Sequence, residues 1–346
     1  MMKRTSIYGL TLSFAFVGLF AQQVHAQDNL NEIFNGNLQD GTKLVNGYID
    51  PFMKTLATGL DNGWYNTAKP HKVAGLDLTL TVNAVMAPKS ANYYNVNDLK
   101  LTNVTLDASQ PAGISNGNVP TIFGPDIGAS YHYKDALGVS QSFTGPGGLD
   151  LKKNIGMNAL PVPMVQLGFG LPKGFDIKFR FFPSTKVGDN GNVQLFGLGV
   201  MHDIKQYIPG IKLLPFDLSA FVGYTHLKLD YGFDTAHPDE HGVFEVNSTT
   251  IQGVISKKIS VLTVYGGAGY NIAKSSLAMI GKYDIDGDGV YGKSAGEVDP
   301  FKSKFAASGP RVTAGFRLKL AVFTLHADYT LQKYSTLTAG FGISIR

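Results

Sequence analysis

Apolar and polar residues alternate along much of this chain, and residues 175–181 show the alternation most clearly. One parity is apolar there and holds Phe175, Ile177, Phe179 and Phe181. The other parity is ionic and holds Asp176, Lys178 and Arg180. Because successive side chains of a β-strand point to opposite faces, this pattern predicts a strand that separates two solvents. With residues 162–171 and the turn at 172–174, it predicts a hairpin.

The same period of two recurs in about twelve segments of roughly nine to fifteen residues between Val73 and the C-terminus. The best patterned segments are 313–320, 323–329 and 337–345, and weaker ones lie near 97–107 and 124–133. A soluble β-sandwich would show the same alternation, with its aromatic residues in the core. This many repeats instead favour an all-β fold, a transmembrane antiparallel β-barrel of about twelve strands, with about ten to fourteen compatible with the pattern.

The first residues predict export. Lys3 and Arg4 precede an apolar run over residues 8–21, and Val24-His25-Ala26 places small residues at the two positions that a signal peptidase reads. We predict a signal peptide over residues 1–26; the alternative, a membrane anchor, needs about 20 apolar residues. After Ala26 no long apolar run follows, so an exported membrane protein of this sequence must span the bilayer as a closed sheet.

Residues 27–72 differ from the alternating remainder, the barrel at 73–346. Asp50 and Pro51 suit the start of a short helix over 51–58, and a second helix is expected near 41–49. This segment either packs on the periplasmic rim of the barrel or enters the lumen as a plug. The predicted strands also contain many of the chain's 41 glycines, which indicates bends and close approach of a plug or ligand to the wall.

Loop lengths orient the predicted barrel, because periplasmic turns are short and external loops are long. The short connections are 172–174, 257–260 and 319–321, and the long ones are 134–161, 183–191, 230–243 and 272–308. Residues 202–214 are the exception, since this segment is long for a periplasmic turn.

Several strings resemble a known family. They are Leu160-Pro161-Val162-Pro163-Met164, the GLPKG turn at 170–174, Phe179-Arg180-Phe181-Phe182-Pro183, and His202-Asp203-Ile204 with Ile208-Pro209-Gly210. Over most of residues 45–346 the chain resembles an uncharacterised outer-membrane β-barrel family of Bacteroidota-type bacteria. More distantly, its architecture is similar to the long-chain fatty-acid transporter class of barrels, which implies an N-terminal plug and hydrophobic cargo.

Net charge and cysteine content limit the classes of partner and cofactor that the protein can bind. Removal of Lys3 and Arg4 with the signal lowers the formal net charge of +4 by two, so the chain has no basic surplus for nucleic acid. The absence of cysteine excludes disulfides, thiol catalysis and cysteine-bound metal. The expected partners are the lipid bilayer of the cell outer membrane, the barrel-assembly machinery and a hydrophobic small molecule.

The ionic residues of the strands are candidates for the wall of the lumen, because a charge facing lipid costs roughly 2 to 4 kcal/mol near the middle of the membrane. They form either a structural ion-pair network or a path for a substrate head group. The candidates are Asp176, Lys178, Arg180, Arg317, Lys319, His326 and Asp328.

One loop resembles a calcium site. Asp284, Asp286 and Asp288 stand at positions 1, 3 and 5, and Gly289 at position 6, of a calcium-loop pattern, but Ala295 replaces the expected Glu at position 12. Calcium in an external loop is therefore the one candidate cofactor, against a solvated acidic loop. Residues 237–241, HPDEH, include residue types that bind metals, but we interpret this segment as a solvated loop.

The leading functional prediction is a channel or binding protein for small hydrophobic or amphipathic molecules. The alternatives are a barrel that serves adhesion or envelope structure through its external loops, and a lipid-acting enzyme. We expect no enzyme, because the G-x-S-x-G string at 113–117 is followed by loop residues rather than a helix. Polar partners for catalysis exist, His326 with Asp328 and Ser219 with Thr225, but nothing in the sequence sets their geometry.

Overall fold

The computed structural model describes residues 38–134, 138–188, 190–232, 237, 239–285, 289–293 and 296–345. The predicted signal peptide lies outside these residues. Within them, no helix is long and apolar enough to cross a membrane.

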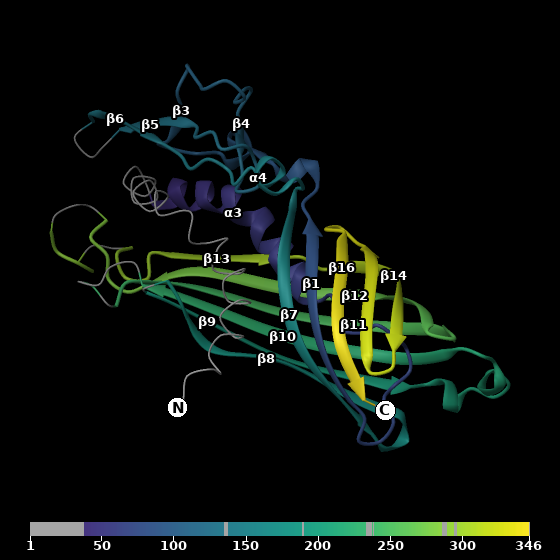
Figure 1. Cartoon of the computed structure of the whole chain (residues 1–346). Coiled ribbons are helices and arrows are strands. Elements are labelled where there is room, and N and C mark those ends of the chain that lie inside the picture. Colours follow the sequence, from purple (N-terminus) through teal and green to yellow (C-terminus); the bar gives the residue numbers. More distant parts are fainter. Residues whose placement is uncertain are drawn as a thin grey trace, which may run out of the picture.

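Ten antiparallel strands form a closed barrel (Figure 1). Strand β1 closes it by pairing with both β16 and β7. The strands are β1 (Leu76–Met86), β7 (Ala159–Leu171), β8 (Phe175–Val187), β9 (Gly191–Asp203), β10 (Asp217–Gly232), β11 (His241–Ile259), β12 (Leu262–Ile280), β14 (Gly309–Leu320), β15 (Phe323–Leu331) and β16 (Thr336–Ile345).

The expected count of about twelve strands is wrong. One further strand, β13 (Phe301–Ala306), pairs with the outer part of β12, where Lys274 faces Ala306. Asn271 of β12 faces Gly309 of β14 in the same register, so β13 continues β14 after a short break. Along the 19 residues of β12, β13 and β14 together therefore form a single neighbouring strand.

The segments expected as strands near 97–107 and 124–133 leave the barrel. They belong to residues 87–158, which we call the loop domain. Its elements are η1 (Lys89–Ala91), β2 (Tyr93–Asn95), η2 (Val96–Leu99), β3 (Thr105–Leu106), β4 (Asn118–Pro120), β5 (Ser130–Lys134), β6 (Ser140–Thr144) and α4 (Leu151–Ile155). Among the described residues of the loop domain no strand exceeds five residues, whereas a membrane-spanning strand needs about 9 to 11.

The two ends of the barrel differ. At the turn end, Leu76 of β1 pairs with Ile345 of β16, and short connections join the strands, including η3 (Pro172–Gly174). The segment 204–216 also lies there and contains η4 (Lys205–Tyr207) and η5 (Ile211–Leu213). At the opposite loop end lie the loop domain and residues 281–300. Strands β8 to β12 run further toward this end than expected, so the predicted loops at 183–191, 230–243 and 272–308 are partly strand.

Side-chain parity divides the wall as the alternation predicts. Phe179 points outward and is 44% exposed, whereas the next residue, Arg180, points inward and is fully buried. Strand β16 follows the same rule, with Leu337, Phe341 and Ile343 exposed and Thr336 and Thr338 buried. An apolar exterior around a polar interior suits hydrocarbon outside and a hydrated lumen inside.

One long helix replaces the two short helices expected near 41–49 and 51–58. Helix α3 (Leu38–Leu60) continues through Pro51. Figure 1 shows it changing direction as it enters the barrel. A proline inside a helix removes one backbone hydrogen bond and favours a bend, which packing on both sides of α3 can tolerate.

Candidate functional site

Residues 38–72, which we call the plug, run the length of the barrel interior. At the loop end, a Cβ placed on Gly296 would lie 3.0 Å from the side chain of Leu38. At the turn end, the backbone N–H of Ala74, just beyond the plug, donates to the carbonyl of Gly170 (3.0 Å). The described part of the N-terminal segment therefore lies inside the wall, and residues 27–37 lie outside the described residues.

The outer half of the plug is helix α3, and it meets the wall through apolar contacts. Met53, Leu56 and Leu60 are almost fully buried on the helix. They belong to one core cluster with residues of several strands, namely Leu160, Val162, Met164, Leu227, Phe244, Val246, Ala273 and Phe305. This layer closes the upper lumen with close-packed side chains.

Asp40 fixes the first turn of α3 to the loop domain. One oxygen of its buried carboxylate accepts hydrogen bonds from the backbone N–H groups of Thr102 (2.8 Å), Asn103 (2.7 Å) and Val104 (3.1 Å). Burial alone would raise the pKa of Asp40, but these hydrogen bonds outweigh it and the pKa lies below its ordinary value.

Two arginines from different strands hold the turn that follows α3. Arg180 of β8 donates to the carbonyls of Leu60 (2.8 Å) and Asn62 (2.7 Å), and its guanidinium lies 3.6 Å from the ring centroid of Trp64. Arg311 of β14 donates to the Asp61 carbonyl (2.9 Å) and to Oδ1 of Asn62 (2.6 Å). The plug is thus fastened to two parts of the wall at mid-barrel.

An aromatic layer lies below the arginines. Trp64 and Tyr65 of the plug pack against Phe221 of β10, each with ring centroids 5.7 Å apart. A Cβ on Gly199 of β9 would lie 2.9 Å from the Trp64 ring. The expectation that strand glycines allow close approach of a plug is therefore confirmed at this position.

The inner half of the plug, residues 61–72, ends in a polar layer. His71 Nδ1 lies 2.9 Å from Oδ2 of Asp176, and Lys178 Nζ lies 3.4 Å from the same oxygen. Lys319 donates to Ser344 (3.1 Å) and Tyr265 donates to Asp328 (2.8 Å).

The structure places all seven lumen candidates on the inner face but not in one site. Arg180 lies at mid-barrel, while Asp176 and Lys178 meet near the turn end. Arg317 and His326 are buried on facing positions of β14 and β15, and Lys319 is half-buried. The other polar residues considered for catalysis hold the plug instead, since Ser219 donates to the Ala68 carbonyl (2.6 Å) and Thr225 to the Leu60 carbonyl (3.3 Å).

Arg311, Asp61 and Asn62 are the residues that sequence reasoning missed. Arg311 shares its parity with Thr313 and Arg317, so extending that strand by two positions would have found it. Asp61 and Asn62 lie in an irregular turn, where no periodicity points to a role.

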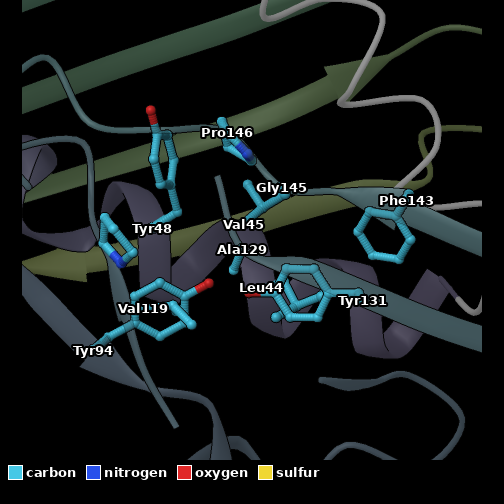
Figure 2. A pocket seen from close by; sticks show the side chains of 11 residues that line it. Leu44, Val45, Tyr48, Tyr94, Val119, Ala129, Tyr131, Phe143, Gly145 and Pro146 are labelled. Carbon is cyan, nitrogen blue, oxygen red and sulfur yellow. The ribbon is translucent and has the colours of Figure 1, made fainter. Parts of the chain in front are cut away.

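A hollow opens where the plug meets the loop domain, and we call it the outer hollow. Its cavity volume is about 20 Å³, which is room for about one water molecule. Its lining residues are Leu44, Val45, Tyr48, Tyr94, Val119, Pro120, Ala129, Tyr131, Phe143, Gly145 and Pro146. Figure 2 shows Leu44 and Val45 of α3 among Tyr94, Tyr131 and Phe143. Burial raises the pKa of Tyr131 to about 12, so its hydroxyl stays protonated at neutral pH.

The calcium prediction is only partly within the described residues. Asp286 and Asp288 lie outside them. Asp284 accepts a hydrogen bond from the backbone of Gly289 (2.9 Å), and buried Glu297 accepts from the backbones of Ile285 and Lys293. Where side chains are described, no group of three or more potential metal ligands occurs, at 237–241 or elsewhere.

A closed sheet with an apolar exterior, a polar interior and an internal plug defines the class: this is an outer-membrane-type β-barrel. Within that class, the chain belongs to a family of unknown function, DUF6588, whose model matches residues 2–345. The resemblance to an uncharacterised family is confirmed to that extent.

The solved structures to which the chain is similar share little sequence with it and superpose poorly. Ail, the attachment invasion locus protein of Yersinia pestis, is 10% identical, with a TM-score of 0.28, covering 79% of this chain and 98% of Ail. The translocator domain of autotransporter NalP from Neisseria meningitidis is 11% identical (TM-score 0.27, coverage 85% and 93%). The Pseudomonas putida toluene transporter TodX is 7% identical (TM-score 0.24, coverage 83% and 78%). None of the curated proteins matches the chain. At these scores the class rests on the chain's own geometry.

Proposed function

We propose that this protein lies in the outer membrane of a Gram-negative bacterium and binds or admits small hydrophobic or amphipathic molecules through the outer hollow. The barrel-assembly machinery would insert it with the turn end toward the periplasm, since single-chain bacterial barrels return both ends of the sheet there. The loop end, with the outer hollow, would then face the outside.

The outer hollow is the observation that carries this proposal. Aliphatic side chains and aromatic rings dominate its lining, and a few hydroxyls are placed among them. Tyr48 donates its hydroxyl to the Gly147 carbonyl (2.8 Å), which leaves its ring to face the hollow. Apolar linings with a few fixed polar groups are usual in sites for small molecules. Because the cavity volume is only about 20 Å³, the rings of Tyr94, Tyr131 and Phe143 would have to move apart to admit a ligand.

Passage through the barrel would require the plug to shift. The apolar layer around Leu56 and the arginine contacts at Leu60 and Asn62 fill the middle of the lumen. Binding at the outer hollow is therefore the first step of the proposed function, and displacement of α3 is the second.

Fluorescence of N-phenyl-1-naphthylamine, a small apolar probe, tests the first step on the purified full chain in detergent. Ala129→Phe fills the hollow, and we expect at least tenfold weaker binding. Ala108→Phe makes the same change at an exposed position of the loop domain and should bind like the unaltered chain. Unchanged binding by Ala129→Phe would refute the site.

A disulfide between plug and wall tests the second step. A Cβ on Gly59 would lie 3.1 Å from Cβ of Val162, so a shift of a few tenths of an ångström brings the pair into the range of about 3.5 to 4.5 Å found in disulfides. Because the chain has no cysteine, Gly59→Cys with Val162→Cys gives one defined cross-link. We expect probe flux into liposomes only after reduction. Equal flux in oxidised and reduced protein would exclude passage that depends on plug movement.

A further inference from the structure

The outer surface of β8, β9 and β10 changes character near the loop end. Phe181, Phe196 and Tyr224 are outward-facing and exposed, and they mark the upper edge of the apolar exterior. Beyond them, the outward positions of the same strands become polar. On β9 and β10 the parity is unchanged along the whole strand, so the change marks a different surrounding medium, which in a membrane is the layer of lipid headgroups.

A hollow of about 270 Å³ lies in this polar surface, and we call it the wall hollow. Its lining residues are Ser184, Asn192, Gln194, Lys228 and Asp230. A β-bulge between Phe182 and Thr185 inserts one extra residue into β8 opposite β9. Bulges bend a strand and redirect its side chains, so this one accounts for the space beside Ser184.

The groups around the wall hollow suit a sugar that carries phosphate. The hydroxyl of Ser184 and the amides of Asn192 and Gln194 can donate to and accept from sugar hydroxyls. Lys228 offers an ammonium group for a phosphate. Asp230 lies 3.7 Å away and both side chains are about one third exposed, so this pair holds the lysine only weakly. Glu245 of β11 faces Lys228 in the sheet register.

Further lysines lie on the same outer surface, one beside the wall hollow and the others two or three strands beyond β10. They are Lys186 on β8, Lys274 on β12, and Lys302 and Lys304 on β13. Their register places them outward, since Lys186 pairs with Asn192 and Lys274 with Asn247. Among the described residues of these strands beyond the apolar edge, the outward acids are Asp230 and Glu245. The surface is therefore net positive directly beyond the apolar edge.

We propose that the wall hollow binds the phosphorylated sugar headgroup of an outer-leaflet glycolipid. Its acyl chains would lie along the apolar exterior below, beside Phe181, Phe196 and Tyr224. Basic residues at the membrane surface attract anionic headgroups, and the amides and hydroxyl add recognition of the sugar. This inference goes beyond the outer hollow and depends only on membrane insertion with the loop end outward.

Native mass spectrometry of the detergent-purified full chain tests the proposal, with bisphosphorylated lipid A as the probe. The double change Lys186→Gln and Lys228→Gln, beside and within the wall hollow, should weaken binding at least tenfold. The matched control is Lys257→Gln, an exposed lysine at the turn end of β11, and it should bind like the unaltered chain. Phosphatidylglycerol, which has the charge but no sugar ring, should bind at least tenfold more weakly than lipid A.

Three outcomes would overturn the proposal: full binding by the double variant, an equal loss in Lys257→Gln, or equal binding of phosphatidylglycerol. Displacement of lipid A by glucose 6-phosphate at equal concentration would also overturn it, because a soluble sugar phosphate would then be the ligand. Binding of N-phenyl-1-naphthylamine in the same variants separates this site from the outer hollow. Gel mobility with and without heating confirms that each variant is folded.

Discussion

Helix α3 and the extended segment that follows it lie in the same barrel but contact it through different chemistry. Around α3 the wall presents aliphatic and aromatic side chains, and the helix buries Met53 and Leu56 against them. Around residues 61–72 the wall presents arginines, hydroxyls and amides that bond to the backbone of the plug. A helix satisfies its own backbone and can pack in an apolar layer, whereas an extended segment needs polar partners from the wall.

The largest expected difference between the two halves of the plug is the side of the membrane from which each end can be reached. An epitope tag placed directly before Leu38 should be accessible to antibody on intact cells, because α3 begins at the loop end. A tag between Val73 and Ala74 should become accessible only after the outer membrane is opened. The opposite pattern would invert the proposed orientation of the barrel.

Packing should dominate the stability of the outer half. Leu56→Ala should lower the free energy of unfolding by about 2 to 5 kcal/mol, because it leaves a cavity in a dry layer. Lys54→Ala on the same helix should change it by less than about 0.5 kcal/mol, since Lys54 pairs only with a partly exposed Asp50. Thermal unfolding followed by circular dichroism measures both, and equal effects would contradict an apolar anchor.

Substitutions at two adjacent residues of β8 compare a position on the outer face with a position that contacts the plug. Phe179→Arg should cost roughly 2 to 4 kcal/mol by placing a charge in lipid, and should sharply lower the yield of folded barrel. Arg180→Ala should cost about 1 to 3 kcal/mol, because it removes the two charged hydrogen bonds to the buried carbonyls of Leu60 and Asn62. Yield in outer-membrane fractions gives the ranking, and a larger loss for Arg180→Ala would refute the face assignment.

The anchor at Asp40 should make the outer end of the plug sensitive to acid. The folded state lowers the pKa of this carboxyl below its ordinary value near 3.8. Its contribution is therefore present at neutral pH and is lost as the pH falls through the lowered pKa. Protease cleavage of the loop domain should rise over that acidic range, and Asp40→Asn should flatten the dependence. An unaltered profile in Asp40→Asn would exclude this anchor.

The smallest expected effect concerns the loop at 281–300. If Asp284 with Asp286 and Asp288 binds calcium, millimolar calcium should slow proteolysis of this loop severalfold, because a bound ion would stiffen the turn. Asp284→Asn should remove the protection. Identical cleavage in calcium and in chelator would exclude the site.

Local alternation predicted the wall well where strands are long. It placed Phe179 and Arg180 on opposite faces, and the structure has them there. It failed for the number of strands, because a short strand of the loop domain such as β5 shows the same local features as a spanning strand. It also divided α3 at Pro51, because local propensity does not include the packing that holds this helix together.

The amino-acid sequence by itself determined which face of each long strand points out of the barrel, since that depends only on residues one position apart. Tertiary structure alone decided which strands close the barrel and what fills it. Asn62 contacts Arg180 across 118 positions and Arg311 across 249 positions. Such contacts depend on the path of the whole chain, so the plug and both hollows could be located only from the folded molecule.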